Sequence, residues 1–348
     1  MSNLRFIIEN TLVPHTAFQQ AQERVEQCLE YASHAVEPVC FALLGESRTG
    51  KSRVLAECYE ANAPQRTKEG LHMPIVRVTT PSKPTVKGLV ETLLSALRDP
   101  AYGKGSEIEK TSRLRTQVEE CGTRMILIDE FQHFYDKVTH RVMEHVADWL
   151  KVFVDEAKVA LVVAGLPSCA TVLRANDQLE GRFLAPLQMP HFDWSVDAER
   201  KEFVGILEAF HEALAEHFDL PNLANDEMAF RCYCATGGLM GYLTKCLRQM
   251  VWNALDAKTM RITLEDLCTA HQIAVWAKAA PPGMEQPFST NFQFAPTADL
   301  LARVRQIGVA VEPPRKTRRA APAAESPEPK QPRGRGRPQA ESAGSSAF

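Results

Sequence analysis

The chain has 348 residues, 45% of them hydrophobic and 24% charged, with a formal net charge of −3 at pH 7. This length suits two domains, and no apolar run reaches the ~18 residues that a membrane-spanning helix needs. Residues 1–5 also lack the apolar core of a signal peptide, so we expect a cytoplasmic protein with no membrane partner.

The nine cysteines are scattered through apolar segments and form no C-x-x-C pair. Cys232 and Cys234 are too close together for the ligand spacing of a zinc site. We therefore expect buried, reduced thiols.

The charge of the chain is divided between an acidic body and a basic tail. Residues 313–348 carry eight Lys or Arg and three Glu, a net charge of +5, which leaves −8 for residues 1–312. The tail is also rich in Pro, Ala, Gly and Ser. We therefore expect it to be disordered and to have a polyanionic partner.

The chain begins with residues 4–12, whose pattern indicates extended structure. A turn at residues 13–15 follows, and Thr16 with Gln19 three positions later resembles a capping box at the start of a helix. An apolar stripe at helical spacing continues that helix to Ala32.

The next segment combines a strand, a glycine-rich loop and a helix. Residues 39–44 are a continuous apolar run typical of a buried strand, and residues 52–61 lack Gly and Pro and favour a helix. The loop between them fits the phosphate-loop (Walker A) pattern G-x-x-x-x-G-K-[ST], here Gly45, Glu46, Ser47, Arg48, Thr49, Gly50, Lys51 and Ser52.

This pattern predicts a site for ATP and Mg²⁺. Glycines let consecutive backbone N–H groups surround phosphates, and the helix N-terminus adds partial positive charge. Lys51 is expected to reach the β- and γ-phosphates, and the Ser52 hydroxyl to bind Mg²⁺. The alternative is a glycine-rich turn without a ligand.

Three more apolar runs alternate with helical segments. Strands are predicted at residues 74–79, 125–130 and 159–164. Helices are predicted at residues 86–97, 106–120 and 141–156. Short apolar strands separated by helices indicate an α/β fold with a parallel sheet and flanking helices.

Two acidic residues end the strand predicted at residues 125–130. A carboxylate at the C-terminal end of a strand can approach the Mg²⁺ held by Ser52, and this is the role expected for Asp129. Glu130 is placed to polarise an attacking water as the general base. An acidic turn is the alternative, and the phosphate loop upstream disfavours it.

After residue 195 the strand patterns end and helical patterns continue to residue 280. The predicted organisation has an N-terminal extension with a helix, a P-loop ATPase core, a helical lid domain, a linker and the basic tail. These parts correspond to residues 1–36, 37–194, 195–280, 281–312 and 313–348.

Together these features resemble an AAA+ P-loop ATPase with a small all-helical lid. Four stretches narrow the resemblance to the TniB/TnsC transposition regulators. They are residues 11–15 (TLVPH), 45–52 (GESRTGKS), 128–133 (IDEFQH) and 178–183 (QLEGRF). The resemblance covers about residues 1–275.

The resemblance implies a slow, switch-like ATPase that forms a homo-oligomer, a ring or a helical filament, on double-stranded target DNA. Such regulators receive a target-site signal from a TniQ-like adaptor, either a DNA-binding protein or part of an RNA-guided complex, and pass it to a transposase. Arg182 then matches the arginine finger that completes the site of a neighbouring subunit, with Arg174 as the second choice.

Two positions depart from the AAA+ pattern. The fourth strand is followed by residues 165–168 (GLPS), where many AAA+ proteins have a polar sensor, and Ser168 is a weak substitute. Residues 237–242 (GGLMGY) resemble the second-sensor turn but contain no arginine, and Lys245 lies just beyond. Both departures bear on the rate of hydrolysis more than on nucleotide binding.

Candidate DNA contacts are local because the body is acidic. Lys83 and Lys87 flank a turn with hydroxyls that can bond phosphates, including Thr85, and Lys104 is a further candidate. In the tail, residues 333–338 (RGRGRP) resemble an AT-hook, with Arg333, Arg335 and Arg337 as its arginines. A solubilising basic linker is the alternative for the tail.

Two other functions are compatible with the same motifs. One is an AAA+ ATPase that loads a helicase or a replication initiator. The other is a scaffold that coats DNA and hydrolyses nucleotide only incidentally.

Overall fold

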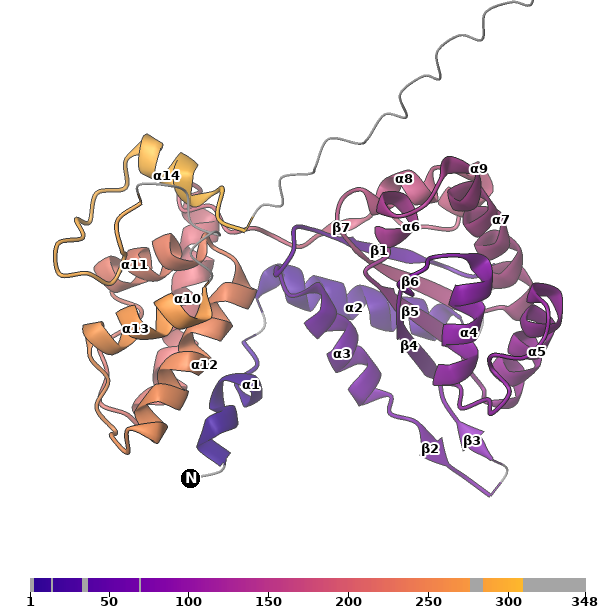
Figure 1. Cartoon of the computed structure of the whole chain (residues 1–348), viewed down its shortest axis with the longest axis horizontal. Coiled ribbons are helices and arrows are strands. Elements are labelled where there is room, and N and C mark those ends of the chain that lie inside the picture. The colour runs from indigo at the N-terminus through magenta and orange to yellow at the C-terminus, as the bar shows by residue number, and fades with distance from the viewer. Residues whose placement is uncertain (1–2, 14, 33–36, 69, 276–283, 309–348) are drawn as a thin grey trace, which may run out of the picture. The chain divides into compact units, whose positions relative to one another are not determined.

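The computed structural model describes residues 3–13, 15–32, 37–68, 70–275 and 284–308. Figure 1 labels its elements. The first part contains η1 (Asn3–Phe6), α1 (Ile7–Asn10), α2 (Thr16–Tyr31), β1 (Phe41–Leu44), α3 (Lys51–Ala61), β2 (Gln65–Arg66), β3 (Leu71–His72), β4 (Ile75–Thr79), α4 (Val86–Ala96), α5 (Glu107–Glu120), β5 (Met125–Asp129), α6 (His133–Asp136), α7 (His140–Ala157), β6 (Ala160–Gly165), α8 (Cys169–Leu173), α9 (Asp177–Glu180) and β7 (Leu187–Gln188). The second part contains α10 (Asp197–Ala215), α11 (Asp226–Thr236), α12 (Met240–Asp256), α13 (Leu264–Ala274) and α14 (Ala298–Val304).

A five-stranded parallel sheet in the order β4-β5-β6-β1-β7 organises the first part (Figure 1). Strand β6 lies between β1 and β5, and its last residue, Gly165, pairs with Leu44 of β1. The carboxyl ends of these three strands therefore meet at one edge of the sheet, where their loops can form a single site. The predicted α/β fold and its four strands are confirmed. The sequence patterns missed the short strand β7 and the β2–β3 hairpin.

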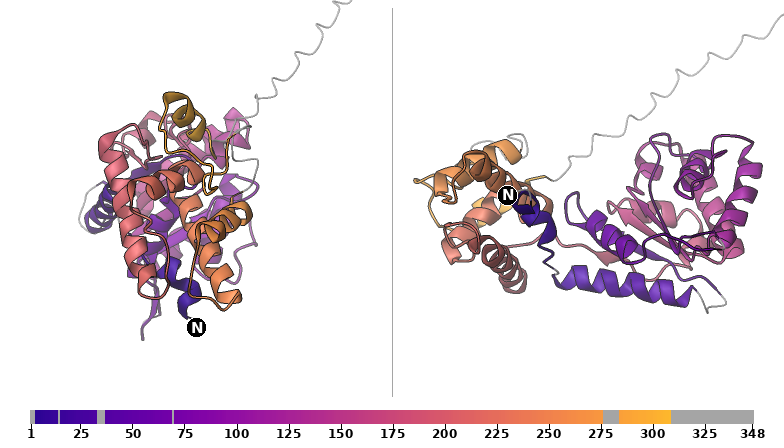
Figure 2. Two further views of the ribbon diagram at one scale, coloured as in Figure 1. Left: turned by 90° about the vertical axis from the view of Figure 1, so that its left-hand side faces the viewer. Right: turned by 90° about the horizontal axis from the view of Figure 1, so that it is seen from below.

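Alternate side chains of the sheet pack against different helices. Ala42 and Leu44 of β1 belong to the core shared with α4, α5 and α7. Phe41 and Leu43 belong to the core shared with α2 and α3, two helices that Figure 2 shows from two further directions. Burial on both faces explains why these strands are continuous apolar runs in the sequence.

The N-terminal segment differs from its prediction. The sequence predicts extended structure at residues 4–12, but most of this segment forms η1 and α1. Ile8 is buried in the core of the second part, and Trp252 Nε1 of α12 donates to the Arg5 carbonyl oxygen at 2.9 Å. Helices this short are unstable alone, so these tertiary contacts decide the conformation.

Helices α10 to α13 enclose a separate core that is rich in aromatic side chains. Phe203 and Tyr233 meet there edge to face, with ring centroids 6.0 Å apart. Gly238, which precedes α12, has a positive φ of 73°, and a side chain on it would lie 2.4 Å from the carbonyl oxygen of Phe192. Glycine is therefore required where this turn meets the chain that enters the helical part.

Residues 284–308 contribute buried side chains to the same helical core, which differs from the linker expected at residues 281–312. Phe288, Phe292 and Val304 are buried there. Phe288 and Phe292 are isolated along irregular chain, and Val304 ends the short helix α14, so this stretch gives no long helical or strand period for sequence reasoning to detect.

Arg231 of α11 anchors this returning segment. Its guanidinium donates to the carbonyl oxygens of Pro287 at 2.6 Å, Ser289 at 2.8 Å and Phe292 at 3.4 Å. It also lies over the Phe292 ring, 5.1 Å from the centroid. One buried arginine thus satisfies carbonyl groups that the irregular chain cannot pair by itself.

Several expectations concern the whole chain. No helix within the described ranges is long and apolar enough to cross a membrane. All nine cysteines are free thiols and eight are buried, as expected. The tail at residues 313–348, with the AT-hook-like arginines Arg333, Arg335 and Arg337, lies outside the described residues.

Candidate functional site

Residues 45–52 lead from β1 into α3 as a compact loop. Gly45, Arg48 and Gly50 have positive φ values of 156°, 70° and 101°. A side chain at Gly45 would also lie 2.9 Å from the carbonyl oxygen of Met189, just after β7. Glycine at position 45 therefore allows a close backbone approach that the predicted phosphate loop needs.

The Lys51 ammonium lies inside this loop. Its Nζ donates to the carbonyl oxygens of Gly45 at 2.8 Å and Glu46 at 2.6 Å, and the residue is 7% exposed. Burial lowers the pKa of Lys51, and the charges of Asp129 and Glu130 oppose that shift. A partly desolvated cation beside the ends of the strands is suited to bind an anion.

The two predicted acids lie at the end of β5 in different environments. Asp129 is 5% exposed, and its Oδ1 accepts a hydrogen bond from the Glu130 backbone N–H at 2.9 Å. Glu130 has a left-handed φ of 55°, and 47% of its side chain is exposed. A non-glycine residue in this conformation stores about 1 kcal/mol or more of strain, which is common at functional sites.

A cavity of about 360 Å³ brings the loop and Glu130 together. Its lining includes two loop residues, two residues that follow β5, the end of β6 and one lid residue: Lys51, Ser52, Glu130, Gln132, Gly165 and Gly241. Asp129 does not line this cavity, although its charge acts on Lys51. Within the described ranges no cluster of three or more His, Cys, Asp or Glu could hold a metal. A hydroxyl and one carboxylate are nevertheless sufficient protein ligands for Mg²⁺ when phosphates complete its shell.

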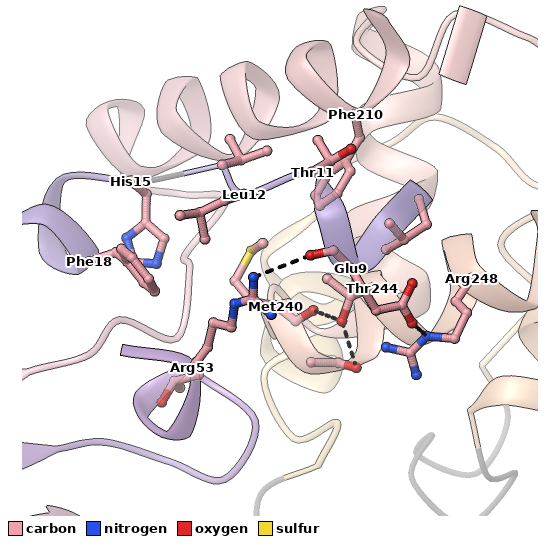
Figure 3. A pocket seen from close by; sticks show the side chains of 15 residues that line it. Glu9, Thr11, Leu12, His15, Phe18, Arg53, Phe210, Met240, Thr244 and Arg248 are labelled. Carbon is pink, nitrogen blue, oxygen red and sulfur yellow. Dashed lines mark hydrogen bonds and ion pairs between the residues drawn. The ribbon is translucent and has the colours of Figure 1, made fainter. Parts of the chain in front are cut away.

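A second cavity of about 220 Å³ adjoins the first, since Gly50, Arg53 and Gly241 line both. Figure 3 shows its walls, which come from the N-terminal segment, the phosphate loop and helices α10 and α12. Sequence reasoning missed this cavity. The TLVPH stretch was the sequence feature that could have indicated it, because Thr11, Leu12, Val13 and His15 all line this cavity.

The N-terminal segment connects the loop helix α3 to α12 at this cavity. Arg53 of α3 donates to the Glu9 carbonyl oxygen at 3.2 Å, and the Glu9 carboxylate forms an ion pair with Arg248 of α12 (Figure 3). The Thr16 backbone N–H donates to Glu202 of α10 at 2.6 Å. One short segment thus contacts both parts of the chain that face the cavity.

His15 is a buried residue that lines the same cavity. It is 5% exposed and lies edge to face against Phe18 and Phe192, with centroids 6.0 and 5.4 Å away. Burial lowers the pKa of His15, which favours the neutral ring. Its Nδ1 has no hydrogen-bond partner among the described residues.

The glycine-rich turn that resembles a second sensor packs directly on the phosphate loop. The Gly241 N–H donates to the Arg48 carbonyl oxygen at 2.8 Å, and the Arg48 guanidinium lies 4.6 Å from the Tyr242 ring centroid. Tyr242 also packs on Gly308, where a side chain would lie 2.7 Å from the ring. Lys245 is exposed, so Arg48 is the basic residue at this contact.

The end of β6 carries no polar side chain of its own at the cavity. The Ser168 hydroxyl is buried without a partner in the described part of the chain, and Ser168 does not line the 360 Å³ cavity. The side chain that lies against Gly165 is instead Gln132, from the loop after β5. Sequence reasoning did not predict this contact.

The two candidate arginine fingers differ in their surroundings. Arg182 forms ion pairs with Asp155 and Glu37, each at 2.9 Å. Arg174 is 69% exposed in its side chain, and its Nε lies 3.6 Å from Glu180. Arg174 is therefore the more accessible of the two within one chain.

The candidate DNA-binding lysines fall into two places. Lys83, Thr85 and Lys87 are exposed at the N-terminal end of α4, where the Thr85 hydroxyl caps the helix by accepting the Gly88 N–H. Lys104 is exposed beyond the other end of α4, a helix of 11 residues and therefore about 16 Å long. The structure does not bring Lys104 together with the other three.

Several solved structures share the fold. Cdc6p from Pyrobaculum aerophilum has a TM-score of 0.55 at 15% identity, over 74% of this chain and 67% of that one. The Aeropyrum pernix ORC2 protein in ADPNP–ADP complexes has a TM-score of 0.56 at 13% identity, over 78% and 72%. The Aeropyrum pernix ORC1 protein in complex with DNA has a TM-score of 0.53 at 16% identity, over 76% and 68%. At these identities the likeness shows the fold alone, which is that of AAA+ ATPases.

Sequence comparison identifies the family. No curated protein matches the chain. The family model described as Bacterial TniB protein matches residues 3–195, more than half of the chain, including the phosphate loop, the two acids and both candidate fingers. The predicted resemblance is confirmed, and the chain belongs to the TniB family of AAA+ ATPases.

Proposed function

We propose that this protein is an ATP-dependent switch that assembles on target DNA and connects a TniQ-like adaptor to a transposase. Membership in the TniB family supports the role in transposition. The observation that carries the nucleotide site is the cavity in which Lys51, Ser52 and Glu130 meet. The adaptor, the transposase and the cytoplasmic location are part of this proposal.

In this proposal the triphosphate of ATP occupies the 360 Å³ cavity. Lys51 exchanges the carbonyl oxygens of its loop for β- and γ-phosphate oxygens, and the loop N–H groups bind the same phosphates. Ser52 and Asp129 are the residues that would hold Mg²⁺, which when bound would neutralise phosphate charge. Glu130 accepts the proton of the attacking water.

The 220 Å³ cavity is the proposed site for adenine and ribose, because it adjoins the phosphate cavity. Ile8, Leu12 and Phe18 provide apolar walls for a flat base, while Thr244 and His15 provide polar groups. Bound nucleotide would then contact the N-terminal segment, the loop and the lid at once.

The Glu130→Gln substitution tests the proposed hydrolysis. An amide cannot accept the proton, so we expect ATP turnover to fall about 10²–10⁴-fold with ATP binding retained. Phosphate release and equilibrium binding measure the two quantities. Glu120→Gln on the exposed side of α5 is the matched control. Wild-type turnover by the Glu130 variant would refute the general-base role.

The same variant separates a switch from a scaffold. A switch that cannot hydrolyse should form long-lived complexes on DNA and lose discrimination between targets, measured by imaging and by strand transfer with transposase and adaptor. Unchanged targeting would favour the scaffold. Helicase loading in place of a response from the transposase would favour the loader alternative.

DNA contacts are proposed at Lys83, Thr85, Lys87 and Lys104, and at the arginines of the tail. Lys83→Ala with Lys87→Ala should weaken binding to all duplex sequences and lower the slope of log K against log salt by about two. Fluorescence anisotropy over a salt series measures this slope. Lys201→Ala, which removes an exposed lysine of α10, provides a control for a general loss of charge. An unchanged slope would exclude the α4 site.

A further inference from the structure

We infer that Gln132 is a positioning residue for hydrolysis, which holds Glu130 at the phosphate cavity and supplies the polar group that the end of β6 lacks. The inference rests on the proposed function, because it assigns a role within the same site. Its basis is one buried amide that contacts the loops after both β5 and β6.

Hydrogen bonds determine the orientation of this amide. The backbone N–H of Leu166 can only donate, so the atom that it contacts at 3.2 Å is the Gln132 oxygen Oε1. The Gln132 nitrogen Nε2 therefore faces Glu130 and donates to its Oε2 at 2.6 Å. A bond from an amide to an ionised carboxylate is stronger than a neutral one, so it can fix one oxygen of Glu130 and leave the other for a proton.

Gly165 provides the space that Gln132 occupies. A side chain at Gly165 would lie 2.2 Å from Gln132 Oε1 and 2.5 Å from Cys169 Sγ. A polar residue at the end of β6 and Gln132 in its present place are therefore mutually exclusive. The Gly165 carbonyl oxygen also accepts the Gly45 N–H at 3.2 Å, which links this position to the phosphate loop.

The surroundings of Gln132 favour a fixed geometry. Gln132 is 5% exposed, and the preceding residue, Phe131, is fully buried and donates its N–H to the Ala164 carbonyl oxygen at 3.0 Å. His133 does not replace Gln132 as the partner of Glu130. Its Nε2 lies 3.8 Å from Glu130 Oε2, and burial together with Lys137 lowers the pKa of His133.

The role follows from the chemistry of hydrolysis. Water attacks the γ-phosphorus, the bond from that phosphorus to the bridging oxygen breaks, and the proton of the water passes to Glu130. A displacement of about 1 Å in such a base can cost about 10²-fold in rate. Gln132 reduces this displacement by connecting the Glu130 carboxylate to the end of β6.

Gln132→Leu tests this role, because leucine has a similar size and cannot form either hydrogen bond. We expect kcat for ATP to fall about 10- to 100-fold while KM and ATP affinity change little. Gln117→Leu on α5 removes a half-buried glutamine elsewhere and should change neither. Thermal unfolding of each variant shows whether it is folded.

A double-mutant cycle distinguishes positioning from a structural effect. If Gln132 acts through Glu130, then Gln132→Leu should cause no further loss in the Glu130→Gln background, because residues that act as a unit are not additive. Fully multiplicative losses would overturn the inference.

Gln132→Glu provides a second variant of similar size. It replaces the donor with a carboxylate that repels Glu130, so we expect kcat to fall at least as far as in Gln132→Leu, with KM little changed. Wild-type kcat in Gln132→Leu would overturn this inference alone. A wild-type protein that binds no ATP would overturn the proposed function as well.

Discussion

Uncharged partners hold the two ions of the proposed active site. Lys51 is bound by loop carbonyl oxygens, and Glu130 by the amide of Gln132. Among the described residues Lys51 has no ion-pair partner, and the pKa of His133, which lies 3.8 Å from Glu130, is lowered, which favours a neutral ring. Both ions can therefore interact with a phosphate and a water molecule when these bind. Arg182 differs, because two carboxylates already bind it.

Arg182→Ala and Arg174→Ala should separate stability from assembly. Arg182 bonds both oxygens of Asp155, so its loss should lower the free energy of unfolding by about 1 kcal/mol, measured with urea. Because Arg174 is mostly exposed, Arg174→Ala should change the free energy of unfolding by less than about 0.5 kcal/mol. ATP-dependent oligomerisation, measured by sedimentation, then identifies the finger. Loss of assembly only in Arg174→Ala would reject Arg182.

The Arg182–Asp155 pair also predicts a dependence on pH. The hydrogen bond from Arg182 lowers the pKa of Asp155 against the effect of burial. A carboxyl group whose pKa is lower in the folded state than its unfolded value of about 3.9 stabilises the fold above that pH and loses this contribution as the pH falls. The difference in unfolding free energy between wild type and Arg182→Ala should therefore narrow below about pH 4. A constant difference would contradict this linkage.

Sequence reasoning could place single residues where a motif fixes both the backbone conformation and the type of side chain. Lys51, Ser52 and Glu130 line one cavity because a strand, a glycine loop and a helix fix their places. It did not predict the contact between Gln132 and the last residue of β6, because that contact depends on the absence of a side chain at Gly165. The sequence feature that permits this contact is Gly165 at the buried end of β6.

At the scale of elements, long periodic segments were predictable and short ones were not. The strands β1, β4, β5 and β6 are buried on both faces and read directly from the sequence. The segment η1–α1 and residues 284–308 have few periodic apolar positions, and their conformations depend on contacts with α11 and α12. The local pattern of apolar residues cannot predict contacts with helices that are distant in the sequence.

Arg231→Ala should release residues 284–308 from α11. Three carbonyl oxygens would lose their donor, and we expect a loss of about 2–4 kcal/mol in the free energy of unfolding. Urea denaturation measures the loss. Arg261→Ala, an exposed arginine 3.8 Å from Asp219, is the control and should change it by less than about 0.5 kcal/mol. Equal stability of the two variants would show that the anchor is dispensable.

At the scale of the molecule, nucleotide should hold three segments that are distant in the sequence. ATP at about 100 times its Kd should raise the free energy of unfolding by about 2.7 kcal/mol. Hydrogen exchange should then slow together in α1, in residues 45–52 and in the first turns of α12, because all three line the two cavities. Lys51→Ala, which should not bind ATP, is the control. Protection confined to residues 45–52 would argue against the cavity at the N-terminal segment as the base site.

The packing of Gly308 on Tyr242 has a mechanical consequence. Gly308 lies against one part of the Tyr242 ring, and the Arg48 guanidinium of the phosphate loop lies over the same ring. Gly308 is therefore connected through two side chains, Tyr242 and Arg48, to the loop that we propose binds phosphates. A displacement of Gly308 would be transmitted to that loop through the Tyr242 ring, so this packing couples the end of the helical part to the proposed nucleotide site.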